Sequence, residues 1–145
     1  MPVQPKPEGY HTVTPYFIVS GAADFIEFLK RAFGAQEKER YGRPDGAIMH
    51  AEVRLGDSIV MLGDASPEFE PTRSSIHLYV DDVDADYKRA LDAGGTSLRE
   101  PTDQFYGDRS AGIQDRFGNQ WWLATHVEDV SPEEMQRRQA AMAQA

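Results

Sequence analysis

The stretch Asp115-Arg116-Phe117-Gly118-Asn119-Gln120-Trp121-Trp122-Leu123-Ala124-Thr125-His126 decides the fold. It predicts a tight turn at Gly118-Asn119 that leads into an apolar strand. A weaker copy lies upstream, with the sequence Arg54-Leu55-Gly56-Asp57-Ser58-Ile59-Val60-Met61. Both stretches run Arg, an apolar residue, Gly, Asn or Asp, a polar residue and then three apolar residues, and Arg54 and Arg116 are 62 positions apart.

A second pair of segments repeats at nearly the same offset. Residues 19–35 align with residues 80–96 at a shift of 61, which matches Val19 with Val80 and Gly34 with Gly95. Two independent matches at nearly one offset indicate an internal duplication. We therefore predict two copies of one module, and we expect any site to lie where the copies meet.

Each module is predicted to run strand, helix, strand, strand, strand. In the first module, apolar residues at i, i+3, i+4 and i+7 spacing predict a helix over residues 22–33, which Gly34 ends. In the second, Asp82 is a candidate cap for a helix whose buried stripe is Val83, Tyr87, Ala90 and Leu91. The expected strands are residues 12–19, 35–41, 48–55, 58–62, 75–80, 96–100, 111–115 and 120–125, with a loop at 101–109.

The predicted domain organisation is one α+β domain with an extension at each end. Residues 1–10 form a Pro-rich arm without periodicity, and residues 11–130 form the domain, made of modules 11–65 and 75–126. Ser131-Pro132-Glu133-Glu134 is a capping box with proline in the first helical turn, so residues 131–145 are expected to form a terminal helix.

The composition argues against several classes of function. The 145 residues carry a net charge of −9, which disfavours nucleic acid and anionic membranes as partners. The chain has no cysteine, so disulfides, thiolate metal sites and a cysteine nucleophile are excluded. An apolar signal core and a run long enough to span a membrane are both missing, and we expect a soluble cytoplasmic protein.

The repeated unit resembles the vicinal oxygen chelate superfamily, which includes glyoxalase I, bleomycin-resistance proteins and extradiol dioxygenases. Within it, the chain is similar to the phosphonate-operon-associated glyoxalase-like subgroup over residues 11–131. Arg116 departs from the family pattern, where the turn usually holds proline. The motifs that carry the similarity are Pro15-Tyr16, Phe33-Gly34-Ala35, His50-Ala51-Glu52, Phe105-Tyr106-Gly107-Asp108-Arg109, Phe117-Gly118-Asn119, and Ala124-Thr125-His126 followed by Glu128-Asp129.

The resemblance implies that each module folds into a curved half-barrel sheet and that the protein is a homodimer. Chelating members hold a metal with one ligand from the first strand and one from the last strand of each module. Counting through the repeat places these positions at Thr14, Val60, Ser75 and Trp122. None of the four offers an imidazole or a carboxylate, so no metal or other cofactor is expected at the usual site.

A relocated metal site is the alternative. His50 and Glu52 share one face of the strand over residues 48–55, while His77 shares a face with Ser75, and Asp64 is a further candidate ligand. An alternating polar face is more commonly exposed to solvent or satisfied by hydrogen bonds.

Other candidate residues lie in the second module. Arg109 and Asp108 either clamp a polar ligand, with Tyr106 as a wall, or pin the loop as a structural pair. Trp122 either lines the cavity for an aromatic ligand or fills the core, and Trp121 is expected to pack against a helix. His126 is predicted to be a capping or surface histidine.

These observations leave three hypotheses for function. The first is a small-molecule-binding protein of the glyoxalase and bleomycin-resistance type without the usual metal ligands. Its candidate ligand-binding residues are His50, Glu52, His77, Tyr106, Asp108, Arg109 and Trp122. The second is a metal-dependent lyase, isomerase or dioxygenase with a relocated site around His50 and His77. The third is a protein whose cavity is filled and that acts only through its surface.

Overall fold

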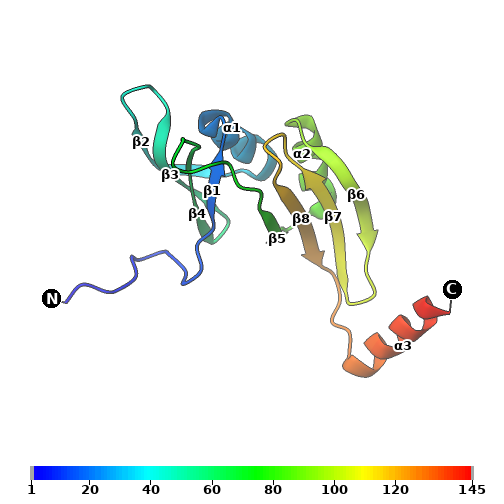
Figure 1. The fold of residues 1–145 in the computed structure, drawn as a ribbon. Coiled ribbons are helices and arrows are strands. Elements are labelled where there is room, and N and C mark those ends of the chain that lie inside the picture. Colours follow the sequence, from blue (N-terminus) through cyan, green and yellow to red (C-terminus); the bar gives the residue numbers. More distant parts are fainter. Residues whose placement is uncertain (1, 145) are drawn as a thin grey trace. The chain divides into compact units, whose positions relative to one another are not determined.

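The computed structural model describes residues 2–144 and divides into two compact units, Met1–Ser74 and Ser75–Ala145. Each unit contains one four-stranded sheet and one helix that packs on it (Figure 1). The predicted α+β fold with two βαβββ modules is confirmed.

The first sheet has the strand order β1-β4-β3-β2. Its strands are β1 (Tyr16–Val19), β2 (Gln36–Gly42), β3 (Ile48–Leu55) and β4 (Ser58–Asp64). β1 pairs with β4 in parallel, and β3 pairs with both neighbours in antiparallel fashion. Helix α1 (Ala22–Phe33) covers one face, where Phe25, Ile26 and Leu29 are fully buried. We call the other face the open face of the first sheet.

The second sheet repeats this topology with the order β5-β8-β7-β6. Its strands are β5 (Ser75–Tyr79), β6 (Thr96–Asp103), β7 (Asp108–Gln114) and β8 (Gln120–His126). Helix α2 (Val83–Asp92) packs against β6, β7 and β8, and Trp121 is fully buried as expected. Of the predicted stripe on α2, Val83 and Ala90 are buried whereas Tyr87 and Leu91 are only half-buried.

The duplication extends to the way in which each helix begins. The Asp64 carboxylate at the end of β4 accepts hydrogen bonds from the backbone N–H groups of Gly21 (3.0 Å) and Ala22 (2.8 Å). The Thr125 hydroxyl on β8 accepts one from the Val83 N–H at 3.0 Å. Ala22 and Val83 are 61 positions apart, as are Asp64 and Thr125. The last strand of each module therefore caps the helix of the same module, because the first N–H groups of a helix lack partners within it.

Two predicted boundaries were wrong. β1 begins at Tyr16 and not at residue 12, and its first partner contact is the Met61 N–H donated to the carbonyl of Pro15 at 2.9 Å. The predicted loop 101–109 shrinks to residues 104–107, since β6 continues to Asp103 and β7 starts at Asp108. The pairing of β6 with β7 extends both strands into the segment whose sequence favoured a loop. This pairing contains two register shifts.

Helix α3 (Pro132–Ala143) ends the described chain and begins at the predicted cap, where the Ser131 hydroxyl accepts from the Glu134 N–H at 3.1 Å. Arg138 ties the helix to the segment after β8 through the Glu128 carboxylate (2.6 Å) and to the loop between β6 and β7 through the Phe105 carbonyl (3.2 Å). No helix within residues 2–144 has the length and apolar character required to cross a membrane.

Candidate functional site

A row of paired residues crosses the open face of the first sheet. Strand register aligns Tyr16 on β1 with Met61 on β4, Glu52 on β3 and Glu39 on β2. Partners in a row point to the same side of a sheet, so these four side chains are neighbours. The row places a carboxylate in the middle of a sheet face.

Glu52 is the buried member of this row, with 5% of its surface exposed. One carboxylate oxygen accepts a hydrogen bond from the Tyr10 hydroxyl, and the other lies 2.8 Å from His50 Nε2. Burial raises the pKa of Glu52, but the hydrogen bonds from His50 and Tyr10 outweigh it and hold the pKa below its ordinary value. Glu52 is therefore an ionised acceptor, which matches the prediction that a polar strand face is satisfied by hydrogen bonds.

His50 links Glu52 to Tyr16. Its Nδ1 atom lies 3.1 Å from the Tyr16 hydroxyl, and the two rings have centroids 5.6 Å apart. Because the Glu52 carboxylate can only accept, we assign the proton of His50 to Nε2, and Tyr16 then donates to Nδ1. Burial raises the pKa of Tyr16, which keeps its hydroxyl protonated. Hydroxyl, imidazole and carboxylate thus form one chain across the face.

Tyr16 also borders a cavity of about 570 Å³. The cavity lies beside β1 and the segment 66–72, which is held by a hydrogen bond from the Thr72 N–H to the Ile18 carbonyl (3.1 Å). Its walls combine apolar and aromatic side chains with one cation and two carboxylates. The lining residues are Tyr16, Ile18, Arg43, Met49, Gly63, Asp64, Ser66, Glu68, Phe69 and Thr72.

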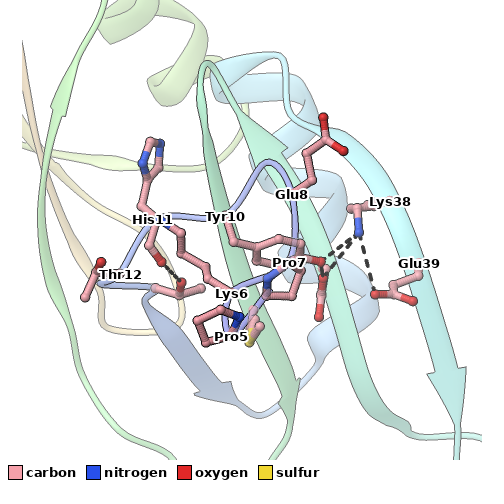
Figure 2. A pocket seen from close by; sticks show the side chains of 12 residues that line it. Pro5, Lys6, Pro7, Glu8, Tyr10, His11, Thr12, Lys38 and Glu39 are labelled. Atoms are coloured by element: carbon pink, nitrogen blue, oxygen red, sulfur yellow. Dashed lines mark hydrogen bonds and ion pairs between the residues drawn. The ribbon is translucent and has the colours of Figure 1, made fainter. Parts of the chain in front are cut away.

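A second cavity, of about 710 Å³, lies under the N-terminal arm (Figure 2). Lys38 and Glu39 line it from β2, Glu52 from β3 and Met61 from β4. The remaining walls come from the arm, between Pro5 and Thr14. The predicted arm thus packs on the open face of the first sheet.

The equivalent row of the second sheet is occupied differently. Register aligns His77 on β5 with Trp122 on β8, Gly112 on β7 and Arg99 on β6. A Cβ atom on Gly112 would lie 2.3 Å from Trp122 Cζ3, so the indole lies directly over the glycine. The Arg99 guanidinium is 5.3 Å from the centroid of that indole, and His77 packs edge-on against Tyr79. Trp122 thus covers Gly112 on this face and is itself half-buried, whereas His77 and Arg99 are exposed.

Asp108 and Arg109 do not pair with each other. They are consecutive residues of β7 and point to opposite sides of the sheet. Arg109 makes two hydrogen bonds to Asp84, at 2.8 and 3.0 Å, and one to Asp103 at 3.1 Å. These contacts favour the structural alternative for Arg109. Tyr106 stays in the loop and packs edge-on against Phe105.

Asp108 is 4% exposed and belongs to a cluster that the sequence did not predict. It accepts a hydrogen bond from the Tyr79 hydroxyl (3.0 Å) and pairs with His126 Nδ1 (2.7 Å), while His126 Nε2 lies 2.8 Å from Asp129. The carboxylates of Asp129 and Asp108 raise the pKa of His126. His126 is therefore a link between β8 and the segment after it.

One of the four expected metal-ligand positions was assigned to the wrong residue. Val60 is 3% exposed and pairs with the buried Val53, so it faces the helix. Met61 occupies the open-face position that corresponds to Trp122, because Tyr16 pairs with Met61 as His77 pairs with Trp122. Counting forward from the turns failed because the first module joins Leu55 and Ser58 by two residues, whereas five residues separate Gln114 and Gln120.

The relocated metal site was predicted around His50, Glu52, His77 and Asp64. His50 and Glu52 do lie side by side, whereas Asp64 is occupied by three backbone N–H groups, including that of Ile48 at 2.7 Å. His77 belongs to the other unit. Across residues 2–144, His, Asp and Glu side chains nowhere form a group of three or more suited to a metal ion.

Sequence reasoning missed Tyr10, Lys38 and Tyr16 as parts of the first cluster. Lys38 Nζ donates to the Tyr10 hydroxyl at 2.7 Å, although the two residues are 28 positions apart. Tyr10 lies in a segment without periodicity, so no local sequence pattern indicated that it belongs to a cluster. The alternation of polar residues on β3 was the one signal that pointed to this face.

Comparison with known proteins agrees with this architecture. A model of the Glyoxalase/Bleomycin resistance protein/Dioxygenase superfamily matches residues 10–123. An uncharacterized protein of Mycobacterium bovis is 38% identical over 135 residues, which cover 86% of this chain and 89% of that protein. An uncharacterized protein of Mycobacterium tuberculosis has the same identity, with 79% of its length covered.

Solved structures share the fold. TioX from Micromonospora sp. ML1 has a TM-score of 0.69 and 24% identity, with 81% of this chain and 99% of that chain covered. A PhnB protein from Bacillus cereus, described as a putative 3-demethylubiquinone-9 3-methyltransferase, has a TM-score of 0.63 and 15% identity, with 79% and 99% covered. At these identities the similarity shows the fold alone. With two βαβββ modules and a family match over most of its length, the chain belongs to the Glyoxalase/Bleomycin resistance protein/Dioxygenase superfamily.

Proposed function

We propose that this chain is a small-molecule-binding protein of the glyoxalase and bleomycin-resistance type, with its pocket on the open face of the first sheet. The observation that carries the proposal is the cavity of about 570 Å³ beside β1. Ligand pockets typically enclose about 300–1,000 Å³, are mostly apolar and present a few converging polar groups. This cavity has that size and that character.

The lining indicates the class of ligand. Tyr16, Met49 and Phe69 offer an aromatic and thioether surface, which suits a flat, partly aromatic molecule. The Arg43 guanidinium and the hydroxyls of Ser66 and Thr72 are polar donors at the wall, whereas the Tyr16 hydroxyl donates to His50. Arg43 Nε is buried and makes no hydrogen bond within the described chain, while the Asp45 carboxylate forms an ion pair with it at 3.7 Å. A polar atom of a ligand would supply the missing hydrogen bond.

We further propose that binding does not use the metal of chelating relatives. With Met61 in place of Val60, the four positions expected from the sequence hold Thr14, Met61, Ser75 and Trp122. Their side chains are two hydroxyls, a thioether and an indole. Divalent first-row metals are held in proteins mainly by imidazole, thiolate and carboxylate groups, and this set has none of them.

A metal-dependent lyase, isomerase or dioxygenase around His50 and His77 is the second candidate. The contact between His50 and the Glu52 carboxylate favours it, because such pairs are common in metal sites. Both ring nitrogens of His50 already face partners, so a metal ion would have to displace either Tyr16 or Glu52.

The test combines metal content with a ligand screen. Purified protein is loaded with zinc, nickel, manganese or iron(II), dialysed, and analysed for bound metal. Small aromatic compounds are then screened by thermal shift against chelator-treated protein. We expect no stoichiometric metal, and stabilisation by a subset of compounds without metal. One metal per chain that is lost in His50→Ala would overturn the proposal in favour of the enzyme.

Two matched variants locate the ligand. Phe69 is 57% exposed at the cavity wall, and Tyr106 is 37% exposed on the predicted loop of the second module. We expect Phe69→Ser to weaken the binding of a screening hit and Tyr106→Ser to leave it unchanged. The reverse result would move the site to the residues 104–107.

We also propose that the protein forms the homodimer that family resemblance implies. Light scattering during size exclusion measures the mass directly. A mass near 16.3 kDa, that of one chain, at micromolar concentration would contradict the dimer.

A further inference from the structure

The N-terminal arm, defined as residues 2–14, is held to the first sheet mainly by one side chain. Within this arm Tyr10 and Thr14 are half-buried, and every other residue is exposed. Besides Tyr10, the His11 ring contributes one hydrogen bond, from Nε2 to the Asp57 carbonyl at 3.0 Å. A segment with so little buried surface opens at a small free-energy cost. The arm is therefore a removable cover.

The contacts of Tyr10 are those of a bound phenol. Its hydroxyl donates to the Glu52 carboxylate and accepts from Lys38 Nζ at 2.7 Å. The Lys38 ammonium also lies 4.7 Å from the centroid of the phenol ring. Figure 2 shows Tyr10 and Lys38 facing each other, with Glu39 beyond the ammonium group. An acceptor on one side and a cationic donor on the other define the hydroxyl position.

Glu52 requires a replacement when Tyr10 leaves. With Tyr10 in place it is 5% exposed, and hydrogen bonding holds its pKa below the ordinary value, so it is ionised. When Tyr10 leaves, water or a ligand has to replace the lost donor. The His50 ring occupies the other oxygen of this carboxylate, and Lys38 Nζ lies 3.9 Å from the oxygen that Tyr10 contacts. Opening of the arm therefore leaves an anionic acceptor that favours a ligand with a hydroxyl donor.

We propose that Glu52 and Lys38 form a second binding site, specific for small phenols, which the arm occupies with its own Tyr10. The cavity of about 710 Å³ around this point provides the room, and Met61 provides an apolar wall. This site is separate from the cavity beside β1, whose lining includes neither Lys38 nor Glu52. A phenol and the arm compete for one place.

Competition makes the affinity depend on the arm. A ligand that binds only the open state has its apparent affinity reduced by the fraction of open molecules. Tyr10→Ala empties the site without touching the sheet. We expect this variant to bind 4-methylphenol, the isolated side chain of tyrosine, at least about tenfold more tightly than the unmodified chain. Tyr10→Phe keeps the ring and loses the hydroxyl, and we expect an intermediate affinity.

The experiment measures dissociation constants for 4-methylphenol and for toluene by NMR titration. In Tyr10→Ala, we expect toluene to bind about tenfold more weakly, since it lacks the donor for the carboxylate. The amide signals of Lys38 and Glu39 report the location. Glu52→Gln in the Tyr10→Ala background is expected to reduce the preference for the phenol. The matched control is Tyr87→Phe, which removes a tyrosine hydroxyl bonded to Ser97 in the other unit.

Proteolysis gives an independent measurement of arm opening. A glutamyl endopeptidase cleaves the bond after Glu8, which lies in the arm. We expect 4-methylphenol to accelerate this cleavage in the unmodified chain, because the ligand displaces the arm. Equal affinity in Tyr10→Ala and the unmodified chain, equal binding of toluene, or cleavage that the phenol slows would each overturn the proposal. Binding of screening hits in the cavity beside β1 is tested separately, so either proposal can fail alone.

Discussion

The two sheets share one topology and differ in what covers their open faces. The central row of the first sheet holds Glu52 beside Met61, and that of the second holds Gly112 beside Trp122. In the second sheet the large indole lies over a residue without a side chain. In the first sheet, a flexible thioether lies beside a carboxylate, and two cavities open next to it. A duplicated backbone thus supports an indole packed on glycine in one copy and a carboxylate beside a cavity in the other.

The histidines of the two units show the same divergence. His50 lies between a hydroxyl and a carboxylate, which suits a neutral ring that accepts at Nδ1 and donates at Nε2. His126 lies between the carboxylates of Asp108 and Asp129, so both of its nitrogens must donate, and this requires the imidazolium. The first arrangement connects residues around a cavity, whereas the second fastens the segment after β8.

The largest expected effect comes from the turns that close the two last hairpins. Asp115 is 2% exposed and accepts from the Phe117 and Asn119 N–H groups and from Trp121 Nε1, at 2.9, 3.0 and 2.9 Å. Asp115→Ala leaves three donors without this acceptor and is expected to lower the free energy of unfolding by about 3 kcal/mol or more. Asp57, in the turn of the first module, is exposed, and its carboxylate accepts a hydrogen bond from the Ser58 hydroxyl at 3.1 Å.

Urea unfolding of the two variants checks this prediction. Asp57→Ala is the matched control, with an expected change within about 0.5 kcal/mol. A similar loss of unfolding free energy in both variants would mean that the two turns contribute equally. That result would contradict the prediction, which rests on the difference in their hydrogen bonds.

The packing of Trp122 on Gly112 in the second sheet gives the next effect. Gly112→Ala places a methyl group where the Trp122 ring lies, and the ring has to move. We expect a loss of about 1–3 kcal/mol in the free energy of unfolding, typical of overpacking. In the Trp122→Ala background the same substitution should cost much less, and a double-mutant cycle measures the difference. Strict additivity of the two changes would contradict the packing of Trp122 on Gly112.

Removing one tyrosine hydroxyl from each polar cluster compares the cluster around Asp108 with the cluster around His50. Tyr79→Phe removes a donor to Asp108, which is 4% exposed, and is expected to cost about 1–2 kcal/mol. Tyr16→Phe removes a donor to the more accessible His50 and is expected to cost about 0.5–1 kcal/mol. Chemical denaturation at pH 7 ranks the two. A larger loss for Tyr16→Phe would place the more tightly bound cluster in the first sheet.

The smallest effect is a dependence on pH. Asp129 and Asp108 raise the pKa of His126 above its ordinary value of 6.5. A raised pKa in the folded state means that the protonated histidine stabilises the fold. This stabilisation is fully present below about pH 6.5 and is lost as the pH rises through the folded-state pKa. NMR titration of the His126 ring measures that pKa.

Variants test the direction of the linkage. The difference in urea midpoint between the unmodified chain and His126→Gln should shrink from pH 5.5 to pH 9. Asp129→Asn should lower the titration midpoint of His126, because it removes the carboxylate that pairs with Nε2 of the ring. A difference that stays constant or grows with pH would contradict the ion pairs of His126.

The sequence alone determined the elements that depend on neighbours along the chain. The apolar stripe predicted helix α1, the alternation of residues predicted β3, and Asp82 and Ser131 cap α2 and α3 as expected. Periodicity and capping act within one or two turns, so they are visible locally. The duplication was visible too, because a repeated module repeats its turn and helix signals.

Only the tertiary structure decided which side chains share a site. Tyr10 and Glu52 are 42 positions apart, and no pattern in the sequence indicates that they are in contact. The position of Val60 was wrong by one residue because the two hairpin turns differ in length, and a shift by one residue moves a side chain to the other face. The faces of this protein depend on strand register. Register is set by pairing between distant segments, which periodicity does not encode.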